Sequence, residues 1–125
     1  MMARILIVED NEDLRNFLRM KLESAGFKVT VAPSGAEALE LMASEPADMV
    51  LTDVFMPEKD GMETIVEIRA RYPQATIIAM SGWDSRSDAD YLRIAREIGA
   101  VRTFRKPFEP EQMVEVLRQL ANPPG

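Results

Sequence analysis

Short apolar segments alternate with longer amphipathic segments along the whole chain. Five apolar runs of four to six residues are rich in β-branched side chains, which is the pattern of strands. The first, third and fourth are almost entirely apolar, as expected for strands covered on both faces of a parallel sheet. The predicted strands are Ala3–Val8, Lys28–Ala32, Ala47–Thr52, Thr76–Ser81 and Val101–Phe104.

The amphipathic segments between the strands carry helix start and stop signals. The second opens with Ser34 followed by Glu37, an S-x-x-E capping box, and the fifth has Pro110 in its first turn. The fourth is predicted to begin near Ser85–Asp88. The apolar stripes expected to face the sheet are Leu14, Phe17, Leu18, Leu22; Ala38, Leu41, Met42; Ile65, Ile68; Leu92, Ala95, Ile98; and Met113, Val116, Leu117, Leu120.

The predicted order of elements is βαβαβαβαβα, which is typical of the α/β class. Right-handed crossovers place helices on both faces of a five-stranded parallel sheet. The length of 125 residues fits one domain, expected over residues 1–121, with 122–125 ("NPPG") as a loose tail.

Composition excludes several kinds of site. The chain has no Cys, so disulfides and thiolate metal sites are impossible, and no His, so no imidazole acts as base, ligand or phosphoacceptor on this chain. The net charge is −6 and the basic residues are scattered among acids, which does not predict nucleic-acid binding. No apolar run approaches the ~20 residues that span a bilayer, and no secretory pattern is present. We therefore expect a cytoplasmic protein without membrane contact.

Polar residues follow the predicted strands where those strands end. Glu9 and Asp10 follow the first strand, Asp53 the third and Lys106 the fifth, and Ser81 ends the fourth. Each alone is typical of a turn, a cap or a solvated surface. In an open α/β sheet, however, sites form at the carboxyl ends of the strands. With strand order 2-1-3-4-5, all five residues converge at one edge.

The chemistry of such a cluster indicates phosphoryl transfer. Three crowded carboxylates repel one another and need a cation, and an all-oxygen ligand set favours Mg²⁺ over zinc. A metal ion, an ammonium group and a hydroxyl together suit the oxygens of a phosphoryl group. Asp53, delivered to the centre by an apolar strand, is the predicted nucleophile, forming an acyl phosphate.

The segments "ILIVEDN", "LTDVFMPEKDG", "IIAMSG" and "FRKPF", in this order and spacing, resemble the receiver domain of two-component response regulators, the CheY-like family. The resemblance covers about Ala3 to Ala121. It implies a flavodoxin-like (βα)5 three-layer sandwich with a parallel sheet of order 2-1-3-4-5. It also suggests a stand-alone, single-domain response regulator that catalyses only its own phosphorylation and dephosphorylation and is otherwise not an enzyme.

The resemblance implies a role for each site residue. Asp53 corresponds to the phosphoacceptor, and Mg²⁺ would be held by Glu9, Asp10, Asp53 and the backbone carbonyl of Phe55. Ser81 would be the switch hydroxyl, and Lys106 the partner of the phosphoryl oxygens. The resemblance also implies a cis peptide bond between Lys106 and Pro107.

Thr103 departs from the family pattern, which often has Tyr or Phe three residues before the lysine. Phe104 is next in sequence and should point to the opposite face of the strand. We therefore expect the switch to act through Trp83–Asp90 instead of an aromatic rotation. Phe55 and Trp83 lie two residues beyond Asp53 and Ser81, and are expected to hinder attacking water and slow self-dephosphorylation.

Without a His, the phosphoryl group must come from a histidine kinase, a histidine phosphotransfer protein or a small acyl phosphate. The output is expected to be contact with an unidentified protein by a monomer or weak dimer. The family often uses the fourth helix, fifth strand and fifth helix for this contact. That face would carry Arg93, Arg96, Arg102 and Arg105, for which simple solvation is the alternative.

Other functions fit less well. Haloacid-dehalogenase-type phosphatases place the nucleophile after the first strand, with a second Asp two residues on, where this chain has Phe55. No G-x-G-x-x-G follows the first strand, and no P-loop is present. The remaining alternative is a degenerate receiver that binds a protein without being phosphorylated.

Overall fold

Strands and helices alternate along the part of the chain that the computed structural model describes, which comprises residues 3–54, 61–81 and 88–121, with only the backbone at 88–91. The elements are β1 (Arg4–Val8), α1 (Glu12–Ser24), β2 (Lys28–Ala32), α2 (Gly35–Ser44), β3 (Met49–Asp53), α3 (Gly61–Arg71), β4 (Thr76–Ser81), α4 (Asp88–Ile98), β5 (Ala100–Arg105) and α5 (Pro110–Ala121).

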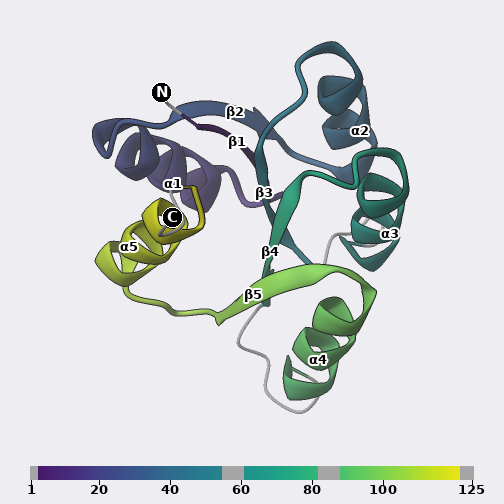
Figure 1. The fold of residues 1–125 in the computed structure, drawn as a ribbon. Coiled ribbons are helices and arrows are strands. Elements are labelled where there is room, and N and C mark those ends of the chain that lie inside the picture. The colour runs from purple at the N-terminus through teal and green to yellow at the C-terminus, as the bar shows by residue number, and fades with distance from the viewer. Residues whose placement is uncertain (1–2, 55–60, 82–87, 122–125) are drawn as a thin grey trace.

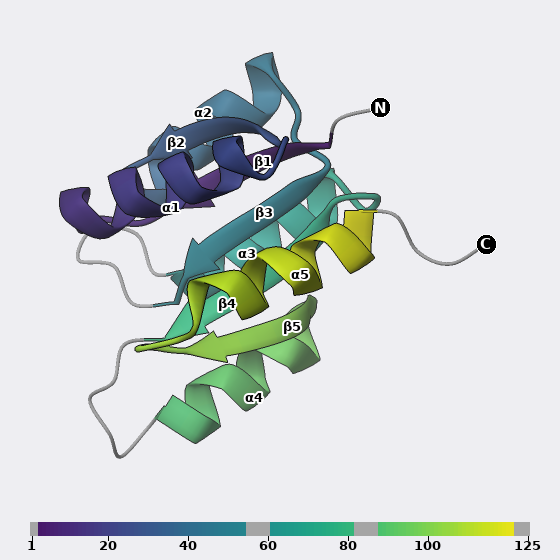
Figure 2. The ribbon, with the colours of Figure 1, turned by 90° about the vertical axis from the view of Figure 1, so that its left-hand side faces the viewer.

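The strands form one parallel sheet of order β2-β1-β3-β4-β5, which confirms the predicted fold (Figure 1). The pairing aligns the strand ends: Val8 lies opposite Thr52, and Asp53 opposite Met80. At the next pair, Ser81 lies opposite Arg105. Because the arrowheads of β3, β4 and β5 point the same way, their carboxyl ends share one edge of the sheet (Figure 2).

Helices cover both faces of the sheet. Helices α1 and α5 lie on one face and α2, α3 and α4 on the other (Figure 1). Alternate residues of β1 enter the two cores: Ile5 and Ile7 pack on the α1–α5 side, Leu6 and Val8 on the other side. This double coverage explains why the central strands are apolar without alternation.

Phe17 was expected in the core of α1, and this prediction is wrong. Leu18 and Leu22 are buried, whereas Phe17 is 37% exposed. Leu14, Leu18 and Leu22 are spaced by four residues and form one stripe, so position 17 falls at its margin. The Phe17 ring instead lies 5.8 Å from the Lys21 ammonium.

Helix starts agree with the capping signals. Ser34 is the N-cap of α2, and its side chain accepts a hydrogen bond from the Glu37 N–H. Asn11 caps α1 in the same way, accepting from the Leu14 N–H at 2.9 Å. Because Asn11 caps α1 directly after Glu9 and Asp10, the chain turns sharply at these two acidic residues.

Among the helices the structure describes, none has both the length and the apolar character needed to cross a membrane.

Candidate functional site

The ends of three neighbouring strands deliver polar side chains into a largely buried setting. Asp53 is the last residue of β3, a strand buried along its whole length, and remains 4% exposed. Glu9 follows β1 and is 1% exposed, and Ser81 ends β4 with no exposed surface. Asp10 is exposed to solvent. The sheet therefore fixes two carboxylates and a hydroxyl rigidly at one edge.

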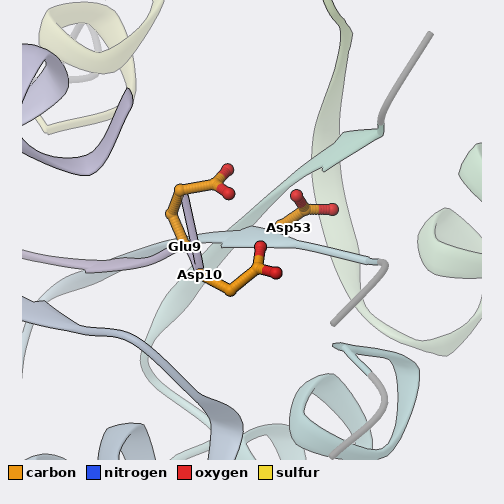
Figure 3. Close-up of side chains that lie close together, drawn as sticks. All are labelled: Glu9, Asp10 and Asp53. Carbon is orange, nitrogen blue, oxygen red and sulfur yellow. The ribbon is translucent and has the colours of Figure 1, made fainter. Parts of the chain in front are cut away.

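The three acids form one cluster. Carboxylate oxygens of Glu9, Asp10 and Asp53 all lie within 4.8 Å of one another, with the side chains converging from adjacent strand ends (Figure 3). Like charges at this separation disfavour ionisation unless a cation is present. Hard oxygen donors of this kind are the ligands that Mg²⁺ prefers in proteins. The donor set, with one exposed member, therefore fits a divalent cation that enters from solvent.

Lys106 provides a positive charge inside the cluster. Its Nζ donates to Glu9 Oε1 at 2.7 Å and to Asp53 Oδ2 at 2.7 Å, and its side chain is 16% exposed. The Lys106 backbone N–H donates to the Ser81 carbonyl at 3.0 Å, which fixes the start of the β5–α5 connection beside β4. The Lys106–Pro107 peptide bond is cis. A metal ion would therefore share these oxygens with the Lys106 ammonium, or displace it from them.

Hydrogen bonds fix both the backbone and the side chain of Glu9. Its N–H donates to the Ala32 carbonyl at 3.0 Å, and its Oε2 accepts from the Asn11 N–H at 3.0 Å. Its own carbonyl accepts from Arg15 Nη1 at 2.9 Å. Neither Asn11 nor Arg15 was among the residues predicted for the site. The helix-start signal could have found Asn11, whereas the reach of Arg15 back to β1 depends on tertiary structure.

Within the cluster, the environment shifts the pKa of Glu9 and of Lys106. Burial raises the pKa of Glu9 to about 7, the nearby Asp53 carboxylate adds to the rise, and the hydrogen bond from Lys106 opposes it. Burial alone would lower the pKa of Lys106, but hydrogen bonds to Asp53 and Glu9 outweigh that effect and the pKa is raised. Near neutral pH, therefore, Lys106 is charged and Glu9 titrates.

We predict that Mg²⁺ affinity rises with pH up to the pKa of Glu9 and then levels off. If Glu9 is a ligand, the proton that it holds below about pH 7 has to leave before its oxygen binds the metal, so binding should release a proton. Affinity should therefore change by up to about tenfold per pH unit below that pKa and little above it.

Isothermal titration calorimetry from about pH 6 to pH 8, in buffers of different ionisation enthalpy, measures both affinity and proton release. Glu9→Gln is the matched control, because it cannot titrate and should show a weaker, flatter profile. Equal slopes in the two proteins would show that another group controls the dependence.

Thr103 and Phe104 lie on opposite faces of β5. Thr103 is half-buried opposite Ala79, a residue of the core on the α2–α3–α4 side. Phe104 packs in the core on the α1–α5 side, with its ring 6.0 Å from the Phe108 ring. This confirms that Phe104 does not take the place of an aromatic at position 103.

Several predicted features lie outside the described residues. Phe55 and Trp83 are among them, so the expected carbonyl ligand and the shielding from water stay predictions. The expected response over Trp83–Asp90 stays a prediction for the same reason. On α4 and β5, the arginines predicted to form an output face occupy exposed positions: Arg93, Arg96, Arg102 and Arg105.

Comparisons with known proteins agree on one family. Residues 5–118 match the family model described as response regulator receiver domain. The chain is 36% identical over 121 residues to the response regulator MprA of Mycolicibacterium vanbaalenii, covering 96% of this chain and 51% of that protein. It is 34% identical over 122 residues to the response regulator receiver protein CpdR of Brucella abortus, covering 95% of this chain and 97% of that protein. The chain thus spans about half the length of the MprA relatives it matches.

Among solved structures, a response regulator receiver domain protein from Clostridium thermocellum superimposes with a TM-score of 0.88 at 28% identity. The superposition covers 97% of this chain and 95% of that one. The likeness therefore extends over nearly the whole chain.

Proposed function

Because the chain belongs to the response regulator receiver family of two-component systems, we propose that it accepts a phosphoryl group on Asp53 and signals to a protein partner. Response regulators receive phosphoryl groups from histidine kinases. The donor proposed here is the phosphohistidine of a histidine kinase or histidine phosphotransfer protein, since this chain has no His. The observation that supports the proposal most strongly is the cluster in which the Lys106 ammonium bridges Asp53 and Glu9.

The proposed reaction is an in-line displacement at phosphorus. A carboxylate oxygen of Asp53 attacks, an O–P bond forms, and the P–N bond to the donor imidazole breaks. The imidazole leaves with the bonding electron pair and takes up a proton from water. Receiver domains bind Mg²⁺ in general, and here Glu9, Asp10, Asp53 and the Phe55 carbonyl would hold the ion, which would neutralise charge on the phosphoryl oxygens.

Lys106 and Ser81 are proposed to bind the product. Lys106 Nζ already lies 2.7 Å from an Asp53 oxygen, so a small movement lets it pair with a phosphoryl oxygen attached there. Ser81 ends the strand next to Asp53, and its hydroxyl is proposed to move inward and donate a hydrogen bond to the same group. Because Thr103 is short and has a stiff χ1, the response is expected mainly over Trp83–Asp90.

The output proposed is protein–protein contact without nucleic acid or membrane, by a monomer or weak dimer. The arginines of α4 and β5 offer a positive surface on an otherwise acidic chain. The only catalysis proposed is the chain's own phosphorylation and dephosphorylation, at a rate that Phe55 and Trp83 are expected to keep slow.

We predict that acetyl phosphate labels the protein once in the presence of Mg²⁺ and not in excess EDTA. Three carboxylates outweigh the single charge of Lys106 and repel an incoming phosphoryl group, and a divalent ion offsets that repulsion. Intact-mass spectrometry over a time course measures the labelled fraction. A protein that stays unlabelled in both conditions would be a degenerate receiver, and equal labelling in EDTA would remove the metal from the proposal.

A further inference from the structure

A shallow groove of about 370 Å³ is lined by residues of α3 and α4. Both helices lie on the face of the sheet away from α1 and α5 (Figure 1). Its walls are Met62 and Val66 from α3 and Ile94 and Ile98 from α4. Val66 is 49% exposed and Ile94 is 39% exposed, although both are large apolar residues. Exposed apolar side chains that gather in one groove, instead of being scattered singly, are a mark of an interaction site.

The walls of the groove are firmly seated on the core. Directly beneath them, Ile65 and Ile68 of α3 and Ala95 of α4 are fully buried against the sheet. Met62 and Ile98 are partly buried against the same core. The groove is therefore a preformed feature of two packed helices, and binding to it would require little reorganisation.

The two charged residues that line the groove are both acidic. The six residues that line it are the four apolar ones and two glutamates, Glu63 and Glu67. Glu63 is exposed, whereas the charge of Glu67 is partly offset by Arg71, which lies 4.0 Å away and one turn further along α3. An occupant with apolar side chains at its centre and basic side chains at its edge would match both features.

We propose that the α3–α4 groove binds an amphipathic helix of a partner protein, with two apolar side chains one turn apart and Lys or Arg beside them. A helix fits because ridges of side chains on a third helix can enter the furrow between two packed helices. A strand would lack main-chain partners, since the walls of the groove are helices whose backbone groups bond within each helix.

One wall of the groove, α3, is packed against the end of the strand that carries Asp53. Helix α3 begins at Gly61, whose Cα is packed so closely on the Asp53 carbonyl and on Val54 that no room remains for a Cβ. Helix α4 is the next element after β4, which ends at Ser81. Phosphorylation of Asp53 should therefore change the affinity of the groove, a part of the inference that rests on the proposed function.

The test uses a synthetic, fluorescein-labelled helical peptide with two leucines four residues apart, flanking lysines and alanines elsewhere. A matched peptide carries glutamates in place of the lysines. Fluorescence polarisation gives the affinity, and amide chemical shifts of ¹⁵N-labelled protein locate the site. We expect shifts concentrated in α3 and α4, and binding of the glutamate peptide at least about tenfold weaker.

Two protein variants make the test specific. Ile94→Lys places a charge in the groove at an exposed position that should not affect folding, and should weaken the lysine peptide at least about tenfold. Val101→Lys changes an apolar residue that is 51% exposed on β5, outside the groove, and should bind normally. Equal binding by Ile94→Lys, shifts confined to α1 or β5, or no binding at all would overturn the proposal.

The remaining outcomes separate the groove from its coupling to phosphorylation. With Mg²⁺ and beryllofluoride we expect a several-fold change in peptide affinity, whereas an unchanged affinity with intact groove binding would overturn only the coupling. Failure of beryllofluoride to bind would count against the proposed function. The groove proposal would then be decided by peptide binding to the free protein. If amide shifts in the groove change without peptide and grow with protein concentration, the occupant is a second copy of this chain. That result would overturn the proposal of a separate helical partner.

Discussion

Asp53→Asn is expected to stay at its unmodified mass after incubation with acetyl phosphate and Mg²⁺, while the wild-type protein gains one phosphoryl group. The amide keeps the size and the acceptor oxygen of the carboxylate but is not a nucleophile toward phosphorus. Folding should survive, because Lys106 keeps its ion pair with Glu9. Loss of one of two buried like charges also removes a repulsion. The effect on labelling should therefore be complete without unfolding the protein.

The matched control is Asp13→Asn, which makes the same chemical change at an exposed position in the first turn of α1. It should be labelled at the wild-type rate. Circular dichroism and thermal unfolding of both variants establish that the fold is intact. Labelling of Asp53→Asn at the wild-type level would remove Asp53 from the role of phosphoacceptor.

Among glycine-to-alanine changes at the described residues, Gly61→Ala is expected to have the largest structural effect. The added Cβ would lie 2.5 Å from the Cα of Val54 and closer still to the Asp53 carbonyl oxygen. Both are backbone atoms, so no side-chain rotation relieves the overlap, and either α3 or the end of β3 has to move. We expect the free energy of unfolding to fall by about 1–3 kcal/mol or more, with slower phosphorylation because Asp53 is displaced.

Gly26→Ala is the control for this variant. Gly26 has φ +101° and no heavy atom within 4 Å of an added Cβ, so alanine there meets backbone strain and no overlap. It should cost about 1–2 kcal/mol of stability without affecting labelling by acetyl phosphate. Chemical denaturation and the labelling time course measure both effects. Wild-type stability and labelling in Gly61→Ala would contradict the close packing of α3 on the end of β3.

Asp53 illustrates what the sequence alone could predict. An apolar run that ends in a carboxylate identifies a buried strand and an acid at its carboxyl end, and parallel pairing then brings that acid beside Glu9 and Ser81. The position of Lys106 beyond the fifth strand follows from the same rule. These inferences rely on strand periodicity and strand order, which are strongly encoded in short apolar segments.

Features that depend on side-chain direction could not be predicted in this way. The double ion pair of Lys106 requires one rotamer of a long side chain, and its reach to Glu9 spans two strands of the sheet. The exposure of Phe17 depends on how far α1 is rotated against the sheet. The groove between α3 and α4 arises from Val66 and Ile94, which lie outside the expected apolar stripes and become neighbours only when the two helices pack.

Locating the phosphoryl group itself tests most directly whether Asp53 is the phosphoacceptor. Protein labelled with acetyl phosphate and Mg²⁺ is treated with borohydride, which reduces an acyl phosphate to the corresponding alcohol, and is then digested and sequenced by tandem mass spectrometry. We expect residue 53 alone to be converted, from Asp to homoserine, and only in samples that contained Mg²⁺. Conversion at Glu9 or Asp10, or a labelled protein in which residue 53 remains Asp, would contradict this assignment.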